Sequence, residues 1–180
     1  MVVIPPELRA LEDSAADRWI IDGQRFDWPH SVRGRREAIA FTRIRLALAR
    51  WADGDSDPRD VVLTDVGCWL SCDPVTALDP PISVIAAETA ARTAPNECWI
   101  AGVPRLAVEF AGPHRHPAWG QRTGAYLACG VRVVWVVETD LRTVAVYKPG
   151  VPPVLYDPTQ TISGDPDLPG FSARVADFFR

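Results

Sequence analysis

Five consecutive apolar residues, Val133-Val134-Trp135-Val136-Val137, constrain the fold more than any other part of this chain. Because alternate side chains of a strand point to opposite faces, a strand that is apolar throughout is typical of a central strand covered on both sides. A similar run over Leu106–Phe110 precedes it. Pro117–Cys129 lies between the two and predicts a helix, with a proline near its start and Gly130 as its C-terminal cap. This order of strand, helix and strand predicts a βαβ crossover.

The other segments extend this pattern. Arg35–Trp51 predicts a helix with Phe41, Ile44, Leu48 and Trp51 on one face, ended by Gly54 and the Asp-rich stretch around it. A second, shorter helix is expected over residues 7–17. Runs of β-branched and aromatic residues predict further strands at Val61–Thr64, Cys68–Leu70, Ile82–Ala86 and Thr143–Tyr147, and a hairpin of Trp19–Asp22 with Arg25–Trp28. We therefore expect an α/β fold: a mixed sheet flanked by helices, with an N-terminal hairpin and a C-terminal hairpin over Val131–Tyr147.

Length and charge limit the class of protein. A chain of 180 residues, 47% of them hydrophobic, is enough for one compact domain over residues 1–180. The net charge of −4 gives no general attraction to phosphate, although it allows a local basic stripe. No apolar run approaches the roughly 20 residues of a membrane span, and the first residues lack the layout of a signal peptide. These features predict a cytoplasmic protein that makes no membrane contact.

The four cysteines contain no C-x-x-C pair, and their simplest interpretation is as small buried residues. A zinc site is the alternative, and it would have to join Cys68 and Cys72 to His114 and His116 without the usual spacing of zinc ligands. The two histidines are otherwise ordinary loop residues.

Glu109 is the most unusual carboxylate, because it interrupts the apolar run Leu106–Phe110. An unpaired charge inside such a strand costs several kcal/mol, so something must compensate for it. A divalent cation, an arginine partner or an exposed strand end would each do so.

Arginines repeat every seven residues along the long helix, at Arg36, Arg43 and Arg50, opposite its apolar face. Such a stripe is usually a solvated face, and the alternative is a surface that follows a phosphate backbone. It is the best basic patch in the sequence.

Four ordered segments resemble one known family. Gly102–Pro113, read as GVPRLAVEFAGP, is similar to the "G-x-P-D-L-V-V-E-V-L-S-P" segment of the Uma-two family of putative restriction endonucleases, in the PD-(D/E)XK nuclease superfamily. The remaining matches are Ala125–Val131 with Val134–Glu138, Leu168–Phe171 with Val175–Phe179, and Ile21–Gly23 with the helix that follows His30. The resemblance covers nearly the whole chain and implies a restriction-endonuclease-like sheet.

The resemblance also implies a reaction and a site. In that superfamily two acids on neighbouring strands hold Mg²⁺ or Mn²⁺, and a lysine helps to activate the water that cleaves DNA. Glu109 matches the second acid. The first acid aligns with Pro81, so Asp79, two residues earlier, or Asp65, on the preceding strand or its turn, would have to replace it as a metal ligand.

The lysine position is also changed. It aligns with Arg122, four residues before Tyr126 and therefore on the same helical face. Arginine keeps the charge but does not act as a base at neutral pH. Lys148 is the only lysine and falls at the end of the last predicted strand, while Arg105 replaces a further family aspartate near Glu109.

Three hypotheses follow. The first is a metal-dependent endonuclease that uses Glu109, Asp79 and Arg122, with altered positions that would leave it inactive or weak. The second is a non-catalytic nucleic-acid-binding or protein-interaction module, in which Arg36, Arg43 and Arg50, with Arg122 and Tyr126, contact the ligand, with DNA as the candidate partner. The third is a homodimer that associates through exposed apolar surface of the C-terminal hairpin.

Overall fold

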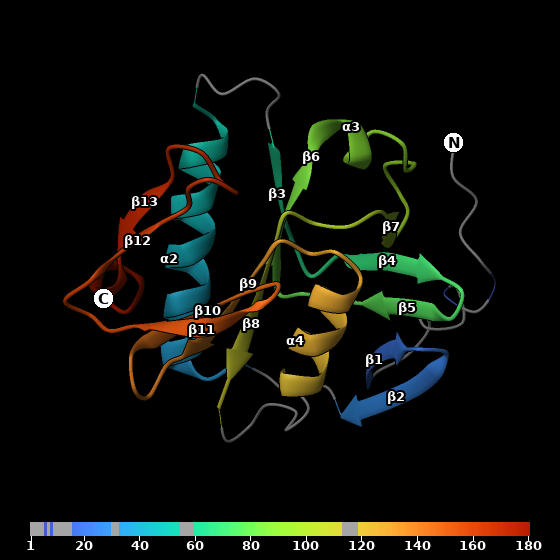
Figure 1. The fold of residues 1–180 in the computed structure, drawn as a ribbon, viewed down its shortest axis with the longest axis horizontal. Helices are drawn as coiled ribbons and strands as arrows, with labels where there is room; N and C mark the ends of the chain where they lie inside the picture. The colour runs from blue at the N-terminus through green and yellow to red at the C-terminus, as the bar shows by residue number, and fades with distance from the viewer. Residues whose placement is uncertain (1–5, 7, 9–15, 30–32, 55–59, 113–118) are drawn as a thin grey trace.

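The computed structural model describes residues 6, 8, 16–29, 33–54, 60–112 and 119–180. A six-stranded sheet runs through the centre of the molecule, with the order β11-β10-β9-β8-β6-β3. These strands are β3 (Asp60–Thr64), β6 (Ile82–Ala86), β8 (Leu106–Ala111), β9 (Val133–Glu138), β10 (Thr143–Lys148) and β11 (Val151–Tyr156). Figure 1 shows helix α2 on one side of this sheet and helix α4 on the other.

The two apolar runs form the parallel centre of the sheet. β8 and β9 pair in parallel from Leu106 with Val133 to Ala111 with Glu138, and α4 (Trp119–Ala128) makes the crossover between them. The helix ends before Gly130, whose φ of 92° is the left-handed conformation that favours glycine. All other neighbours in this sheet are antiparallel. The predicted βαβ unit is therefore confirmed.

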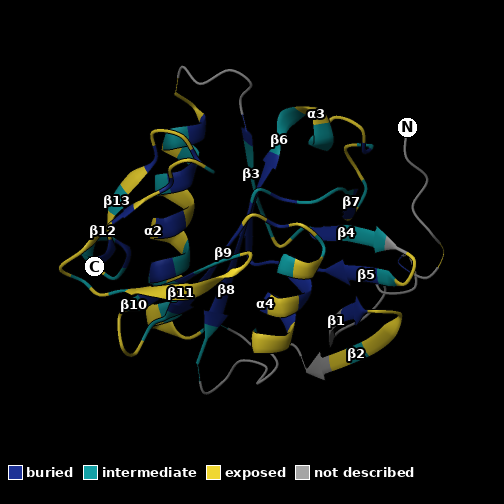
Figure 2. Cartoon of the chain, viewed as in Figure 1, coloured by how far each residue is buried: buried dark blue, intermediate teal, exposed yellow. Residues whose placement is uncertain are grey.

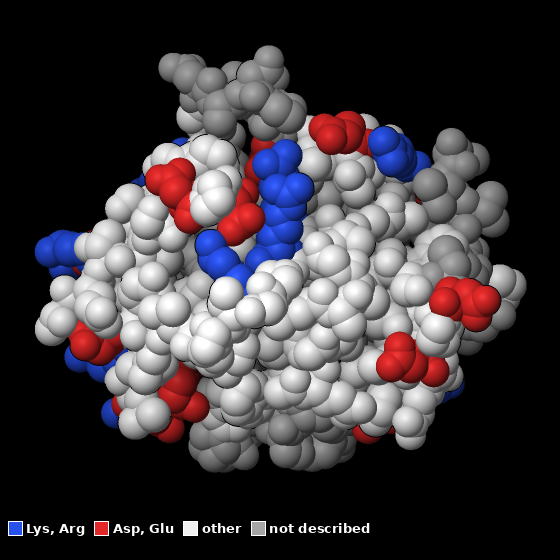
Figure 3. All heavy atoms as spheres, in the orientation of Figure 1, with Lys and Arg blue, Asp and Glu red and all other residues white. Residues whose placement is uncertain are grey.

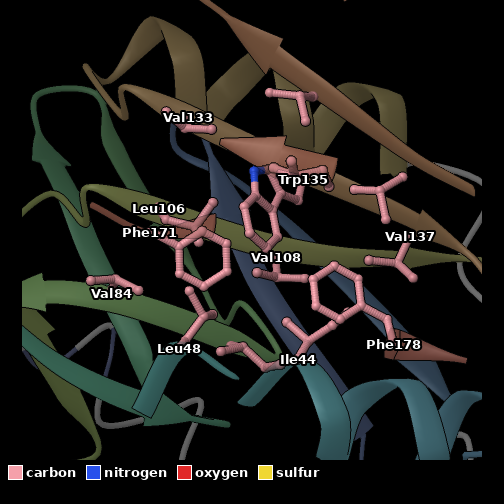
Figure 4. Packing of buried hydrophobic residues seen from close by; sticks show 14 of the residues in the cluster. Ile44, Leu48, Val84, Leu106, Val108, Val133, Trp135, Val137, Phe171 and Phe178 are labelled. Atoms are coloured by element: carbon pink, nitrogen blue, oxygen red, sulfur yellow. The ribbon is translucent and has the colours of Figure 1, made fainter. Parts of the chain in front are cut away.

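Helix α2 (Arg35–Ala52) covers one face of the sheet. Its buried residues recur at helical spacing, so that Ile44 and Leu48 contact the side chains of the central strands. Figure 4 shows these two residues opposite Val108 and Trp135, with Phe171 and Phe178 closing the cluster. Figure 2 shows the opposite side of α2 largely exposed, as expected for an amphipathic helix.

A second sheet, with the order β2-β1-β5-β4-β7, lies beyond α4. Its strands are β1 (Ala16–Ile21), β2 (Gln24–Pro29), β4 (Gly67–Cys72), β5 (Val75–Leu78) and β7 (Trp99–Ala101). Trp19 and Leu78 of this sheet share a buried cluster with Tyr126 of α4 and with the β8 and β9 residues on the second face of the central sheet. Glu109 belongs to that face, because Leu106, Val108 and Phe110 point toward α2.

The chain ends beside α2. Strands β12 (Thr161–Ser163) and β13 (Ser172–Arg174) form a small antiparallel pair, followed by the 3₁₀ helix η1 (Val175–Phe178). Figure 1 shows this segment next to α2, on the side away from α4. The short helix α3 (Ala87–Ala90) follows β6.

The predicted elements agree with the observed ones, including the N-terminal β1–β2 hairpin and the antiparallel β9–β10 hairpin. The hairpin is extended by β11, which the sequence did not indicate because Pro152 and Pro153 lie within it. The helix expected over residues 7–17 falls mostly outside the described residues, and β1 already begins at Ala16. None of the described helices is long and apolar enough to cross a membrane.

Candidate functional site

Glu109 lies within the middle of the molecule, on the face of β8 that meets α4 and the second sheet. Its side chain is only 8% exposed. The neighbouring strand β6 pairs antiparallel with β8, from Ile82 opposite Val108 to Val84 opposite Leu106. Continuing that register by one residue brings Pro81 opposite Glu109. The strand position from which a second acid would face Glu109 therefore carries a side chain without a ligand atom.

Arg122 compensates the charge of Glu109. Its Nε and Nη2 atoms both donate to Oε1 of Glu109, at 3.0 and 2.8 Å. The hydroxyl of Tyr126, one helical turn later, donates to the same oxygen at 2.8 Å. The pair that the sequence places on one face of the helix thus meets a single carboxylate oxygen.

Asp79 meets the other side of the same guanidinium. It lies in the connection between β5 and β6, and its Oδ1 accepts a bond from Nη1 of Arg122 at 2.9 Å. The backbone oxygen of Asp79 accepts a further bond from Nη2 at 3.0 Å. Arg122 consequently joins three parts of the fold: α4, β8 and the connection between the two sheets. We call Asp79, Glu109, Arg122 and Tyr126 the Arg122 cluster.

An aromatic ring completes the surroundings of the guanidinium. The Cζ atom of Arg122 lies 4.8 Å from the centroid of the Trp19 ring, a cation–π arrangement worth up to about 2 kcal/mol when water is excluded. Sequence reasoning missed Trp19, because nothing in the pattern of the N-terminal hairpin indicates that β1 lies against α4. Its position in the short apolar run Trp19–Ile21 was the only available signal.

The protonation states follow from burial and from these contacts. Burial alone would lower the pKa of Arg122, but the carboxylates of Glu109 and Asp79 raise it well above its ordinary value. Burial, reinforced by Glu109, raises the pKa of Tyr126 well above its ordinary value. Although a third of the Asp79 side chain is exposed, burial of its carboxyl also raises its pKa, and Arg122 opposes that shift.

Asp65 lies elsewhere in the fold. It follows β3, which β6 separates from β8, and its backbone has a φ of 53°. Its side chain is 58% exposed and accepts a bond from Nη2 of Arg33 at 2.7 Å. The structure therefore brings Asp79 to Glu109 and does not bring Asp65 there.

The residues do not fit a Mg²⁺ or Mn²⁺ ion between Glu109 and Asp79. Such an ion takes oxygen ligands in near-octahedral geometry, and a guanidinium already bonds to both carboxylates where the ion would lie. Among the described residues, no three His, Cys, Asp or Glu side chains gather into a metal site. His114 and His116, and the side chain of Cys72, lie outside what the structure describes, so the zinc interpretation stays a prediction there.

The residues predicted to contact nucleic acid lie on two opposite faces of the central sheet. Arg36, Arg43 and Arg50 lie on α2, on the opposite face of the sheet from the Arg122 cluster. Arg36 pairs with Asp140 at 2.9 Å. Lys148, the single lysine of the sequence, lies outside the Arg122 cluster and pairs with Asp167 at 2.9 Å. Tyr126 was predicted to contact nucleic acid, whereas its side chain is fully buried. The α2 arginines and Tyr126 therefore share no surface.

The mixed sheet with α2 on one face and the β8–α4–β9 crossover on the other defines a restriction-endonuclease-like α/β protein. The family model Uma2, described as "Putative restriction endonuclease", matches residues 6–176, and the chain belongs to this family. The crystal structure of a putative nuclease belonging to DUF820 from Anabaena variabilis ATCC 29413 has the same fold. Its TM-score is 0.77 at 16% identity, over 96% of this chain and 95% of that one. No curated protein matches the chain.

Proposed function

We propose that this member of the family is a non-hydrolytic protein that retains the nuclease fold as a binding module. One observation carries the proposal: the guanidinium of Arg122 bridges Glu109 and Asp79. Metal-assisted phosphodiester hydrolysis requires a cation that binds the attacking water and the scissile phosphate. In this chain the two carboxylates bond instead to the guanidinium of Arg122, which is part of the protein. This group does not activate a water molecule as a nucleophile and is not exchanged for a metal ion from solution.

The properties of arginine support the same conclusion. Its pKa is well above the physiological range, so it does not take a proton from water. Its exposed fraction is 8%, and its N–H groups point to Glu109, Asp79 and Tyr126. It is therefore not presented to a phosphate from solution. The cluster serves as a structural link in the position where relatives of the superfamily are expected to carry out chemistry.

The alternative is a Mg²⁺- or Mn²⁺-dependent endonuclease, which the family membership favours. An assay of DNA cleavage separates the two functions. Purified protein is incubated with supercoiled and single-stranded DNA in Mg²⁺ or Mn²⁺, beside Glu109→Gln. We expect equal background from both proteins. Cleavage that depends on the metal and is lost in Glu109→Gln, with the variant still folded by circular dichroism, would overturn the proposal.

Metal binding gives a second, independent readout. Isothermal titration with Mn²⁺ is expected to show no site on the wild-type protein, because a cation entering the cluster meets a guanidinium 2.8 Å from Glu109. Stoichiometric binding that Glu109→Gln removes would contradict this expectation.

A further inference from the structure

A groove lies between α2 and the C-terminal segment, on the side of the molecule away from the Arg122 cluster. Its volume is about 480 Å³, within the range of ligand-binding pockets. One wall is formed by α2 and the other by residues 170–173 with Asp177, Phe178 and Arg180. Figure 1 shows these two segments side by side.

Two hydrogen bonds hold the walls together. Nε1 of Trp51 donates to the backbone oxygen of Pro169 at 2.9 Å, and Nε of Arg43 donates to the backbone oxygen of Arg180 at 2.8 Å. They join α2 to the C-terminal segment at both ends of the segment. The groove is therefore preformed, which lowers the entropic cost of binding a ligand.

The charges that line the groove are mainly positive. Arg43, Arg50 and Arg180 line it, together with one acid, Asp177. Asp177 is already paired with Arg180 at 2.7 Å and with Arg174 at 3.2 Å. Within the described part of the chain Arg50 makes no ion pair, and Arg43 uses only its Nε atom in the bond to Arg180. The groove thus offers guanidinium groups to an anion, although the chain as a whole carries a net charge of −4.

We propose that this groove binds a short stretch of single-stranded nucleic acid. Guanidinium groups bind phosphate oxygens in a bidentate manner. Seven residues of helix separate Arg43 from Arg50 by about 10 Å, so the two guanidinium groups would contact different phosphates of one strand lying along α2. The half-buried indole of Trp51 lines the groove beside Arg50, and aromatic rings in basic grooves stack on bases irrespective of sequence.

The small number of arginines that line the groove favours a single strand over a duplex. On the face drawn in Figure 3, basic and acidic side chains of the described residues are interspersed, apart from one short blue stripe with red atoms beside it. Specific duplex contacts bury on the order of 1,000 Å² or more of protein surface and need many phosphate contacts. The groove instead fits one chain lying along α2.

Fluorescence anisotropy of a labelled twelve-nucleotide oligo(dT), at low salt and without divalent metal, tests the proposal on the full chain. Arg50→Glu is expected to weaken binding about tenfold, since it removes a charge-assisted contact. The matched control is Arg45→Glu, which makes the same charge change at an exposed position of the same helix outside the groove. It is expected to stay close to wild type.

Three results would overturn the proposal. One is the absence of wild-type binding at low salt; another is an equal loss in Arg50→Glu and Arg45→Glu, which indicates unspecific attraction. The third is equal competition by a glutamate-rich peptide of similar charge, which assigns the groove to an acidic protein segment. Melting temperatures of both variants verify folding. None of these results bears on Arg122, whose cluster lies across the sheet from this groove.

Discussion

Arg122 donates two hydrogen bonds to one oxygen of Glu109, so the two residues form a buried ion pair in which the Nη2 to Oε1 distance is 2.8 Å. Tyr126 and Asp79 occupy further hydrogen-bonding positions of the same pair. Breaking such a pair leaves an uncompensated charge in the interior, whereas removing both charges together costs much less. This asymmetry is measurable by substituting the two residues singly and together.

Arg122→Met is therefore expected to lower the free energy of unfolding by about 3–5 kcal/mol, because Glu109 loses its compensating charge. Denaturation by urea, followed by circular dichroism, measures the change. A loss below about 1 kcal/mol would show that the carboxylate finds another partner or takes up a proton.

The double variant Glu109→Gln with Arg122→Met is the control for that experiment. We expect it to be less destabilised than the sum of the two single variants, with a coupling energy of about 1–3 kcal/mol. Additive losses would mean that the two side chains contribute independently to stability. That result would contradict the short hydrogen bonds between them.

The stability of the protein is expected to depend on Tyr126 at high pH. Burial raises the pKa of this phenol above its ordinary value of 10.0. Above about pH 10 the unfolded chain releases a proton that the folded protein retains, so stability falls by about 1.4 kcal/mol per pH unit until the folded pKa is reached. Tyr126→Phe has no such proton, so its free energy of unfolding does not fall in this way. Urea denaturation should therefore show that the difference in unfolding free energy between wild type and variant shrinks between pH 9 and pH 11. A deficit that does not change with pH would contradict the burial of the hydroxyl.

The central part of the fold was predictable from local patterns. The apolar runs of β8 and β9, the proline and glycine that bound the predicted helix between them, and the helical spacing of Ile44 and Leu48 each depend on neighbouring residues alone. β11 was missed because it contains Pro152 and Pro153. Prolines in a sequence argue against a strand, since they lack the backbone N–H, but a strand at the edge of a sheet tolerates them. The short strands β5, β7, β12 and β13 carry too few residues for a clear alternation.

All four members of the Arg122 cluster were candidate residues in the sequence, but the sequence did not predict the hydrogen bonds that join them. An arginine partner for Glu109 was one of three open alternatives, and Arg122 and Tyr126 were placed on one face by their spacing. The bridge to Asp79 depends on the path of the Asp79-Pro80-Pro81 connection, and the ring of Trp19 depends on how two sheets pack. Neither is encoded by periodicity, since both join residues far apart in the chain.

Cysteine reactivity is expected to follow burial. Burial, with Asp79 nearby, raises the pKa of Cys68 to about 12, so it carries almost no thiolate at pH 8. Cys98 is exposed. A short treatment with iodoacetamide, followed by peptide mapping, should modify Cys98 and leave Cys68 unmodified until the protein is unfolded in urea. Equal labelling of both in the native protein would contradict the packing of β4.

The exposed edge of the central sheet predicts self-association. β11 is the outermost strand, and Val151, Val154 and Leu155 are 57%, 52% and 62% exposed. Pro152 and Pro153 lack an N–H, so two copies of this edge would associate mainly through side chains rather than a continuous ladder. Light scattering at micromolar concentration should show a dimer for the wild-type protein. Leu155→Lys should be monomeric, because a charged side chain at the contact removes apolar area that the dimer would bury. Leu46→Lys, which changes an exposed leucine of α2, serves as the control and should remain dimeric. A monomeric wild-type protein would exclude this edge as an interface between copies of the chain.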